Sequence, residues 1–239
     1  MELKDLMQGG DSRSKDFLEK IRGYNNVLAF ASLGAHVDNS LSRGRGIYTF
    51  KVHGSIYHNI GPMMPGGVAD QAPRFAQLYF YDTDHELQNR LHHVPELDVD
   101  VLRTLQSMMH RTNPYAQAFR SAAATMQDNC ISEMRMIIVE TRANGWHYLA
   151  PRASEVAVIM PGQGDESNIG HRDIVVNYCN GGLKRISNLH RSYMPLVYVL
   201  LFPNGEDRWH PYIPLLRLHR TNDDEYGNPH VNNVGKHVS

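Results

Sequence analysis

The sequence has little cysteine, no excess of charge of either sign and no long apolar run. Its 239 residues include two cysteines, Cys130 and Cys179, which are too few for a disulfide framework and form no Cys-x-x-Cys pair that could hold zinc. This scarcity favours a reducing, intracellular compartment. The formal net charge is −1, so the chain lacks the overall positive field of many nucleic-acid-binding proteins. Any DNA contact must therefore come from local basic patches.

Membrane spans and export signals are not expected either. No run of about 18 apolar residues exists, so the sequence predicts no transmembrane helix and no contact with a membrane. The polar start, residues 1–14, lacks the apolar segment of a secretory signal. Hydrophobic residues make up 41% of the chain and charged residues 21%. That composition is typical of a folded globular protein and excludes wholesale disorder.

Helical patterns are present in both the first and the middle part of the chain. Apolar spacing predicts a helix that begins at a Ser14 cap and ends at Gly34. Asn113 is the predicted cap of a helix over 114–128, whose first turn holds Pro114. The other predicted helices cover 84–93 and 99–110.

Strand patterns alternate with these helices. Gly54 is predicted to separate two strands within 47–60, and the run Asn180-Gly181-Gly182 is predicted to turn a hairpin over 172–187. The other predicted strands cover 75–82, 133–142 and 154–162. Four prolines predict an irregular segment after these strands: Pro195, Pro203, Pro211 and Pro214.

The order of these elements lacks a βαβ rhythm. It indicates an α+β fold with a mixed, mainly antiparallel sheet and several helices. We expect a flexible N-terminus over 1–14, one α+β domain over 15–218, and a polar, disordered tail over 219–239. A subdivision of the domain near 128–132 stays open.

An ordered series of short blocks between about residues 15 and 215 resembles one known family. The early blocks are Phe17-x3-Ile21-Arg22-x-Tyr24-Asn25-Asn26, Ala29-Phe30-x-Ser32-Leu33-Gly34-Ala35, Tyr48-x-Phe50, Gly54, Tyr57-His58-x-Ile60-Gly61 and Phe75-Ala76-Gln77-Leu78-Tyr79-x-Tyr81-Asp82. The later blocks are Asn113-Pro114, Phe119-Arg120, Arg172-Asp173-Ile174-Val175-Val176, Gly181-Gly182-Leu183-Lys184-Arg185-Ile186-Ser187, His190-x-Ser192-Tyr193-Met194-x-Leu196 and Leu200-Leu201-Phe202-Pro203-x-Gly205-Glu206-Asp207. In order and spacing they are similar to the N-terminal region of Helitron transposon proteins, which join a rolling-circle nuclease to a DNA helicase.

The resemblance implies an accessory region that lies ahead of the nuclease. The family's nuclease uses a His-hydrophobic-His metal motif with catalytic tyrosines, and its helicase uses a phosphate-binding loop. This sequence has no His-x-His and no GxxxxGK[ST] pattern. We therefore expect a truncated copy that is not an enzyme, binds no cofactor and no metal, and is nuclear if the family role is retained.

Local basic clusters beside aromatic residues are the candidate DNA contacts. Single strands bind to proteins through positive charge together with base stacking on aromatic rings. The interleaved rings are Tyr24, Tyr48, Tyr57, Tyr193 and Trp209. The candidate contact residues are Lys20, Arg22, Arg43, Arg45, Lys184, Arg185, His190 and Arg191. The expected partners are single-stranded DNA and a downstream nuclease or helicase domain, or a related full-length protein.

Three alternatives stay open beside this interpretation. The chain could be a small free-standing enzyme that uses His171, Asp173 and Cys179, or a transposon remnant without a function. Fourteen histidines also invite a metal site, although zinc usually needs paired ligand spacings; the candidates are His53, His58, His92, His93 and His110. For the accessory region, we expect an exposed apolar patch that the next domain would cover, formed by Tyr198, Phe202, Trp209 and Tyr212.

Overall fold

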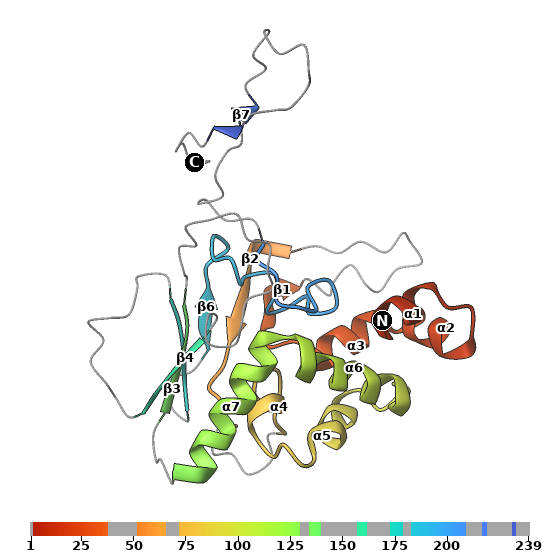
Figure 1. Ribbon diagram of the computed structural model, residues 1–239, viewed down its shortest axis with the longest axis horizontal. Helices are drawn as coiled ribbons and strands as arrows, with labels where there is room; N and C mark the ends of the chain where they lie inside the picture. The colour runs from red at the N-terminus through yellow and green to blue at the C-terminus, as the bar shows by residue number, and fades with distance from the viewer. Residues whose placement is uncertain are drawn as a thin grey trace.

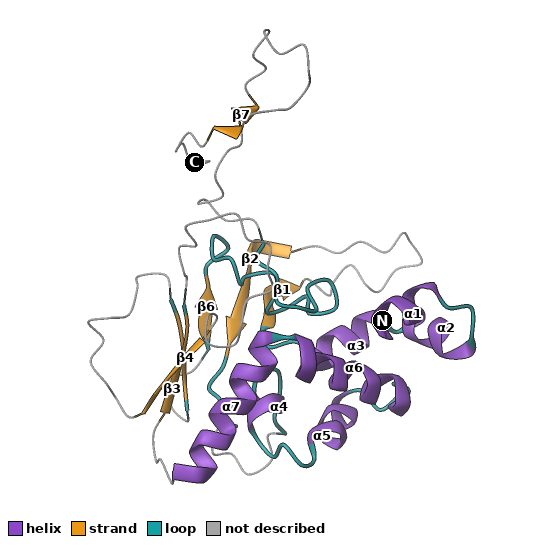
Figure 2. Ribbon diagram, viewed as in Figure 1, coloured by secondary structure: helices purple, strands orange, loops and turns teal. Residues whose placement is uncertain are grey.

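A computed structural model describes residues 2–37, 52–65, 72–129, 134–139, 157–161, 173–178, 183–208, 217–218 and 231–232. In these residues the helices gather on one side of the molecule and the strands on the other (Figure 1, Figure 2). The helices are α1 (Glu2–Gln8), α2 (Ser12–Glu19), α3 (Ile21–Leu28), α4 (Gln77–Phe80), α5 (Glu86–His93), α6 (Val99–Thr112) and α7 (Pro114–Asn129). None of these described helices is long and apolar enough to cross a membrane.

The main strands form two three-stranded antiparallel sheets, which confirms the predicted α+β class. Sheet A has the order β1-β2-β6 and sheet B the order β4-β3-β5. Their strands are β1 (Ser32–Val37), β2 (Val52–Ile60), β3 (Met134–Ile138), β4 (Ala157–Pro161), β5 (Ile174–Asn177) and β6 (Lys184–Ile186). A separate pair joins β7 (Arg217–Leu218) to β8 (Val231–Asn232).

One apolar core lies beneath both sheets and the helices. Its centre is Phe30, whose ring stacks on Tyr79 at 4.5 Å and on Phe119 at 5.8 Å between ring centroids. The carbonyl of Leu196 accepts hydrogen bonds from the backbone of Phe30 and Ala31 at 2.8 and 3.0 Å. Residues 188–204 form turns without helix or strand, as the prolines predicted, and the Leu196 carbonyl holds this segment to the residues that follow α3.

Local signals gave the two longest helices correctly. Oδ1 of Asn113 accepts from the backbone N–H of Tyr115 and Ala116 at 3.0 and 3.2 Å, which confirms the predicted cap of α7. Oδ1 of Asp98 caps α6 in the same way, accepting from Asp100 and Val101 at 2.9 Å. These bonds satisfy N–H groups that have no partner inside the helix.

The predicted first helix was wrong in its ends. Asp11, not Ser14, caps α2, and Ser14 is itself buried. The helix breaks at Lys20, and Gly34 lies in β1 rather than at a helix end. The segment before Ser14 contains α1, in which Leu6 packs into the core and leaves only 5% of its surface exposed.

Three strand predictions need correction. Residues 77–80 form α4, because Leu78, Tyr79 and Phe80 are all buried and complete burial removes the periodicity that separates helix from strand. Strand β2 runs unbroken through Gly54.

The two halves of the predicted hairpin pair elsewhere: β5 pairs with β3 and β6 pairs with β2. Its turn, residues 179–182, lies outside the described residues. The tail predicted to be disordered contains β8, whose partner β7 supplies the backbone hydrogen bonds that it needs.

Candidate nucleic-acid interface

The outer face of sheet A brings together side chains from all three of its strands. In the register of the sheet, Gly34 of β1 lies opposite Tyr57 of β2, and Asn59 of β2 lies opposite Arg185 of β6. Because side chains alternate along a strand, Tyr57 and Asn59 face away from the buried His58 and Ile60. Tyr57 and Asn59 are each half-buried, whereas Arg185 is exposed.

The ring of Tyr57 lies against the backbone of β1 at Gly34. A Cβ atom at position 34 would overlap two ring carbons of Tyr57 and would lie 2.9 Å from Nδ2 of Asn59. Only glycine leaves this space, so the residue at position 34 determines where the ring sits. This close approach accounts for a glycine inside β1, where glycine otherwise weakens a strand.

A guanidinium group covers the same ring. Cζ of Arg185 lies 4.5 Å from the centroid of Tyr57, within the range of a cation–π interaction. The neighbouring Lys184 is also exposed, but it lies opposite Ile60 and so projects on the other side of the strand from Arg185. We call Tyr57, Asn59 and Arg185 the sheet A platform. It combines an aromatic ring, an amide and a guanidinium group on one small surface.

The opposite face of sheet A is packed and neutral. The ring of His58 stacks on Tyr193 at 3.8 Å with an interplanar angle of 9°. Its Nδ1 lies 2.8 Å from the carbonyl oxygen of Tyr193, where an N–H at this position would donate. Burial lowers the pKa of His58, although the bond to the carbonyl opposes the shift. His58 therefore fastens the segment that follows His190 to the sheet.

The predicted DNA contacts divide into those that reach the surface and those that do not. Lys184 and Arg185 lie together on β6, and Arg22 is exposed on α3. Lys20 is bonded to the carboxylate of Asp16 and donates to the carbonyl of Glu96 at 2.7 Å. Arg43 and Arg45 lie outside the described residues.

Two candidates near the turn after β6 are corrected. His190 is 1% exposed, and its Nδ1 accepts from the backbone N–H of Ser192 at 3.0 Å. Nη1 of Arg191 lies 2.9 Å from Oδ2 of Asp207, and only 12% of the Arg191 side chain is exposed. Both side chains bind the protein's own fold, so we remove them from the candidate contacts.

The other histidine candidates have separate contacts. The rings of His92 and His93 are neighbours on α5, with centroids 5.6 Å apart, but His92 is exposed, whereas the ring of His93 lies 2.6 Å from the carbonyl of Pro73. His110 contacts Glu86. The side chain of His53 lies outside the described residues. Within the described part of the chain, no three His, Cys, Asp or Glu side chains come together as metal ligands would.

The residues of the enzyme alternative and of the apolar patch are only partly described. Asp173 is half-buried just before β5, while His171 and Cys179 lie outside the described residues. Tyr198 and Phe202 are both half-buried, and Arg208 lies 5.9 Å from the ring of Phe202. Trp209 and Tyr212, the other members of the predicted patch, also lie outside the described residues.

Sequence reasoning missed a buried charge cluster in the helical layer. Glu86 and Arg90 are 1% and 0% exposed, and Arg90 binds both Glu86 and the carbonyl of Val27. Glu86 also lies 3.0 Å from Nε2 of His110 and 3.0 Å from Nη1 of Arg120. Glu86 and Arg90 are four residues apart on a predicted helix, and that spacing was the available signal.

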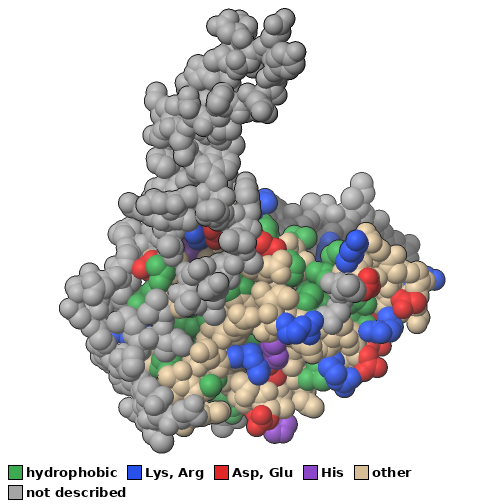
Figure 3. Space-filling view, in the orientation of Figure 1, with side chains coloured by type: hydrophobic (Ala, Val, Ile, Leu, Met, Phe, Trp, Pro, Cys, Tyr) green, Lys and Arg blue, Asp and Glu red, His purple; other side chains and the backbone are tan. Residues whose placement is uncertain are grey.

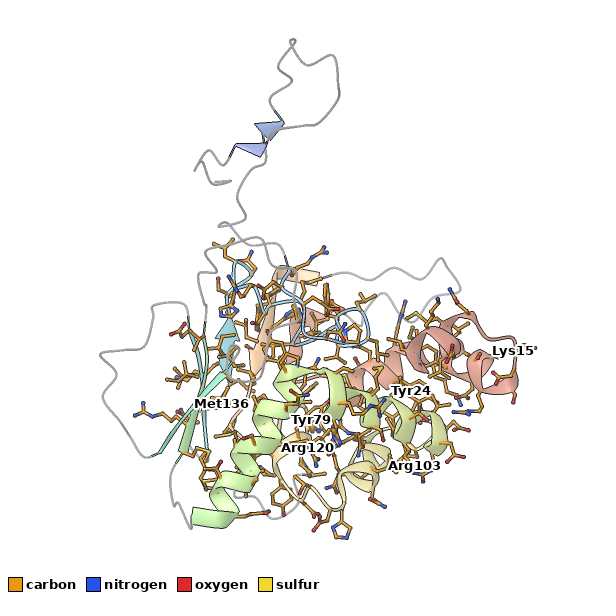
Figure 4. The ribbon with its side chains drawn as sticks, in the orientation of Figure 1. Lys15, Tyr24, Tyr79, Arg103, Arg120 and Met136 are labelled. Atoms are coloured by element: carbon orange, nitrogen blue, oxygen red, sulfur yellow. The ribbon has the colours of Figure 1, made fainter. Side chains whose placement is uncertain are left out.

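Two cations and a histidine hold this carboxylate ionised. Burial alone would raise the pKa of Glu86, but the hydrogen bond from His110 and the charge of Arg90 outweigh it and keep the pKa below its ordinary value. The guanidinium of Arg90 also lies 4.3 Å from the ring centroid of Tyr79. Figure 4 labels Tyr79 and Arg120, which both belong to the helical layer.

Comparison with family models and with curated proteins finds no match to either. The function is therefore argued from the chemistry of the surfaces and from the resemblance of the sequence blocks.

Proposed function

We propose that this chain is a non-catalytic accessory region of a Helitron-like rolling-circle transposon protein, and that it holds single-stranded DNA on the sheet A platform. The observation that carries the proposal is the pair formed by Tyr57 and Arg185 above Gly34. The order of the sequence blocks supplies the family. A nuclear location follows if the family role is retained.

The chemistry of the platform suits a single strand. Proteins hold single strands by combining cations along the backbone with aromatic rings on which bases stack. Arg185 supplies a positive charge for a phosphate, and Asn59 supplies an amide that can bond to a base edge. Arg185 covers Tyr57 in the unbound protein, so a base would stack on the guanidinium plane or displace it toward a phosphate.

The scaffold role is the other form of the accessory proposal. In that form the chain would pack against a nuclease or helicase domain and would not touch DNA. The half-buried Tyr198 and Phe202 and the exposed Leu201, at 67%, are consistent with such a contact. A test for DNA binding separates the two forms.

The test is a titration of fluorescent oligo(dT) with the whole chain at low salt, followed by the Tyr57→Ala and Tyr57→Phe variants. Stacking of a base on a protein ring contributes about 1–3 kcal/mol. Tyr57→Ala should therefore weaken binding by at least about fivefold, whereas Tyr57→Phe, which keeps the ring, should bind almost as the wild type does.

A matched pair at the charged position sharpens the test. Arg185→Ala should lower the affinity and reduce the dependence of binding on salt, while Arg185→Lys should keep the salt dependence and lose the stacking plane. If the wild-type chain does not bind oligo(dT) at low salt, the DNA-handling form is wrong and the scaffold form remains.

A further inference from the structure

Helices α6 and α7 carry a long segment without negative charge. Asp and Glu make up 25 of the 239 residues, yet none occurs between Val101 and Gln127. The charged residues of the segment are Arg103, Arg111 and Arg120, accompanied by His110. Arg103 and Arg111 are exposed, and His110 and Arg120 are partly exposed. We call these four residues the α6–α7 basic face.

The basic face lies on one side of the molecule. Figure 4 labels Arg103 and Arg120, which point outward from α6 and α7 on the side turned to the viewer. In the same orientation, Figure 3 shows blue and purple side chains over these helices among tan and green atoms, with red side chains toward the right-hand and lower edges. The exposed neutral residues of the segment include Ser107, Thr112, Ser121 and Gln127, which carry hydroxyl or amide groups.

The nearest carboxylate of α5 is hidden beneath this face. Glu86 is 1% exposed, while the side chains of its partners His110 and Arg120 remain 23% and 37% exposed. Arg90 and Arg120 both bind the one carboxylate of Glu86, so the cluster has a net positive charge. Arg120 carries this charge to the surface. The bonds to Glu86 also hold Arg120 and His110 in place before any ligand arrives, which lowers the entropy lost on binding.

At the other end of the basic face, the ion pair of Arg103 does not prevent this arginine from binding a ligand. Arg103 binds Asp100, but 57% of the Arg103 side chain and 74% of the Asp100 side chain are exposed. An ion pair this exposed to water contributes little stability. A phosphate group can therefore replace Asp100 as the partner of Arg103.

The basic face differs from the sheet A platform in having no exposed Tyr, Phe or Trp ring. Tyr115 and Phe119, the Tyr and Phe residues of α6 and α7, are 1% and 0% exposed. A surface of arginines, hydroxyl groups and one partly exposed histidine matches the contacts that proteins make to the phosphates of a duplex.

We propose that the α6–α7 basic face binds the phosphate backbone of double-stranded DNA, next to the single strand held by sheet A. This inference rests on the proposed function for the class of ligand. Arg103 and Arg111 are two helical turns apart, which places them about 12 Å from each other along α6. Such a span lets the two guanidinium groups reach different phosphates of one duplex. Contacts of this kind are independent of base sequence.

The experiment measures binding of a blunt 20-base-pair duplex and of oligo(dT) in parallel, using the whole chain over a range of salt concentrations. In the double variant R103Q/R111Q, duplex affinity should fall by about three- to tenfold, and the slope of log affinity against log salt should decrease by about 2. Its affinity for oligo(dT) should stay within twofold of the wild type.

A control with the same change in charge tests whether the position matters. Arg13 and Lys15 are exposed on α2, and Figure 4 places Lys15 at the far end of the helical layer from Arg120. The double variant R13Q/K15Q should bind the duplex as the wild type does. Ser107 is exposed on α6, one turn from Arg103 and one from Arg111, so Ser107→Arg should strengthen duplex binding and steepen the slope by about 1.

The outcomes separate the two proposals. Duplex binding that is absent at low salt, unchanged in R103Q/R111Q, or lowered equally by R13Q/K15Q overturns the duplex site. If the wild type binds the duplex but not oligo(dT), the proposed function of sheet A is overturned and the duplex site stands.

Discussion

The helical layer and sheet A handle charge in opposite ways. In the helical layer a carboxylate and an arginine, Glu86 and Arg90, are almost completely buried. On sheet A the cations Lys184 and Arg185 are exposed, and one of them rests on an aromatic ring. A buried charge is tolerated when an opposite charge is bonded to it, whereas an exposed charge can be solvated by water. The stability of the helical layer therefore depends on the ion pair, whereas the cations of sheet A are exposed at the surface.

The largest expected effect comes from removing the carboxylate in the helical layer. Glu86→Gln leaves Arg90 buried without its counter-charge and should cost about 3–5 kcal/mol of the free energy of unfolding. Urea denaturation measures the loss. The control is Asp100→Asn, which removes the exposed carboxylate bonded to Arg103 and should cost less than about 1 kcal/mol. Equal losses in the two variants would mean that burial of the cluster has no energetic consequence.

Acid should weaken the helical layer through the same residue. Because the pKa of Glu86 in the folded protein lies below its ordinary value of 4.5, its contribution to stability is complete above about pH 4.5. It is lost as the pH falls through the folded value. The urea midpoint should therefore drop below pH 4.5 in the wild type and drop less in Glu86→Gln. An identical acid profile for both proteins would contradict the assignment.

A smaller effect should follow from filling the space beneath the ring on sheet A. Gly34→Ala places a Cβ where the ring of Tyr57 lies and should cost about 1–3 kcal/mol in urea denaturation. In a Tyr57→Ala background the same change should cost much less, because the overlapping ring is gone. Additive losses in the double variant would show that the ring is not the obstacle.

The smallest effect concerns the histidine on the inner face of sheet A. The pKa of His58 is lowered by burial, so its contribution is complete above the ordinary value of 6.5 and is lost as the pH falls through the folded value. His58→Phe keeps a ring against Tyr193 but loses one hydrogen bond, at a cost of about 1 kcal/mol near neutral pH. As the pH falls below 6.5, the urea midpoint of His58→Phe should fall less steeply than that of the wild type. A parallel fall in both proteins would contradict the burial of a neutral imidazole.

The sequence predicted best what depends on neighbours along the chain. The α+β class, helices α5 to α7 and the Asn113 cap follow from local spacing and capping chemistry. Strands β3 and β4 follow from short runs of branched residues. Helix α4 was not predicted, because a segment buried on every side shows neither the 3.6-residue period of a helix nor the two-residue period of a strand.

The parts that failed depend on residues far apart in the sequence. β5 pairs with β3 and β6 pairs with β2, which are strands far away in the sequence. The Asn-Gly-Gly run, which is typical of a turn, favoured the pairing of β5 with β6 instead. The contact of Tyr57 with Gly34 and the burial of His190 are also tertiary features. Lys184 and Arg185 were found because two adjacent cations beside a strand are visible in the sequence itself.

The affinity for oligo(dT) of the wild type, Tyr57→Phe and Tyr57→Ala at one low salt concentration tests whether sheet A holds single-stranded DNA through the ring of Tyr57 and the charge of Arg185. We expect strong binding by the first two proteins and at least about fivefold weaker binding by the third. Equal affinities of all three proteins, or binding by none of them, would rule out stacking of a base on Tyr57.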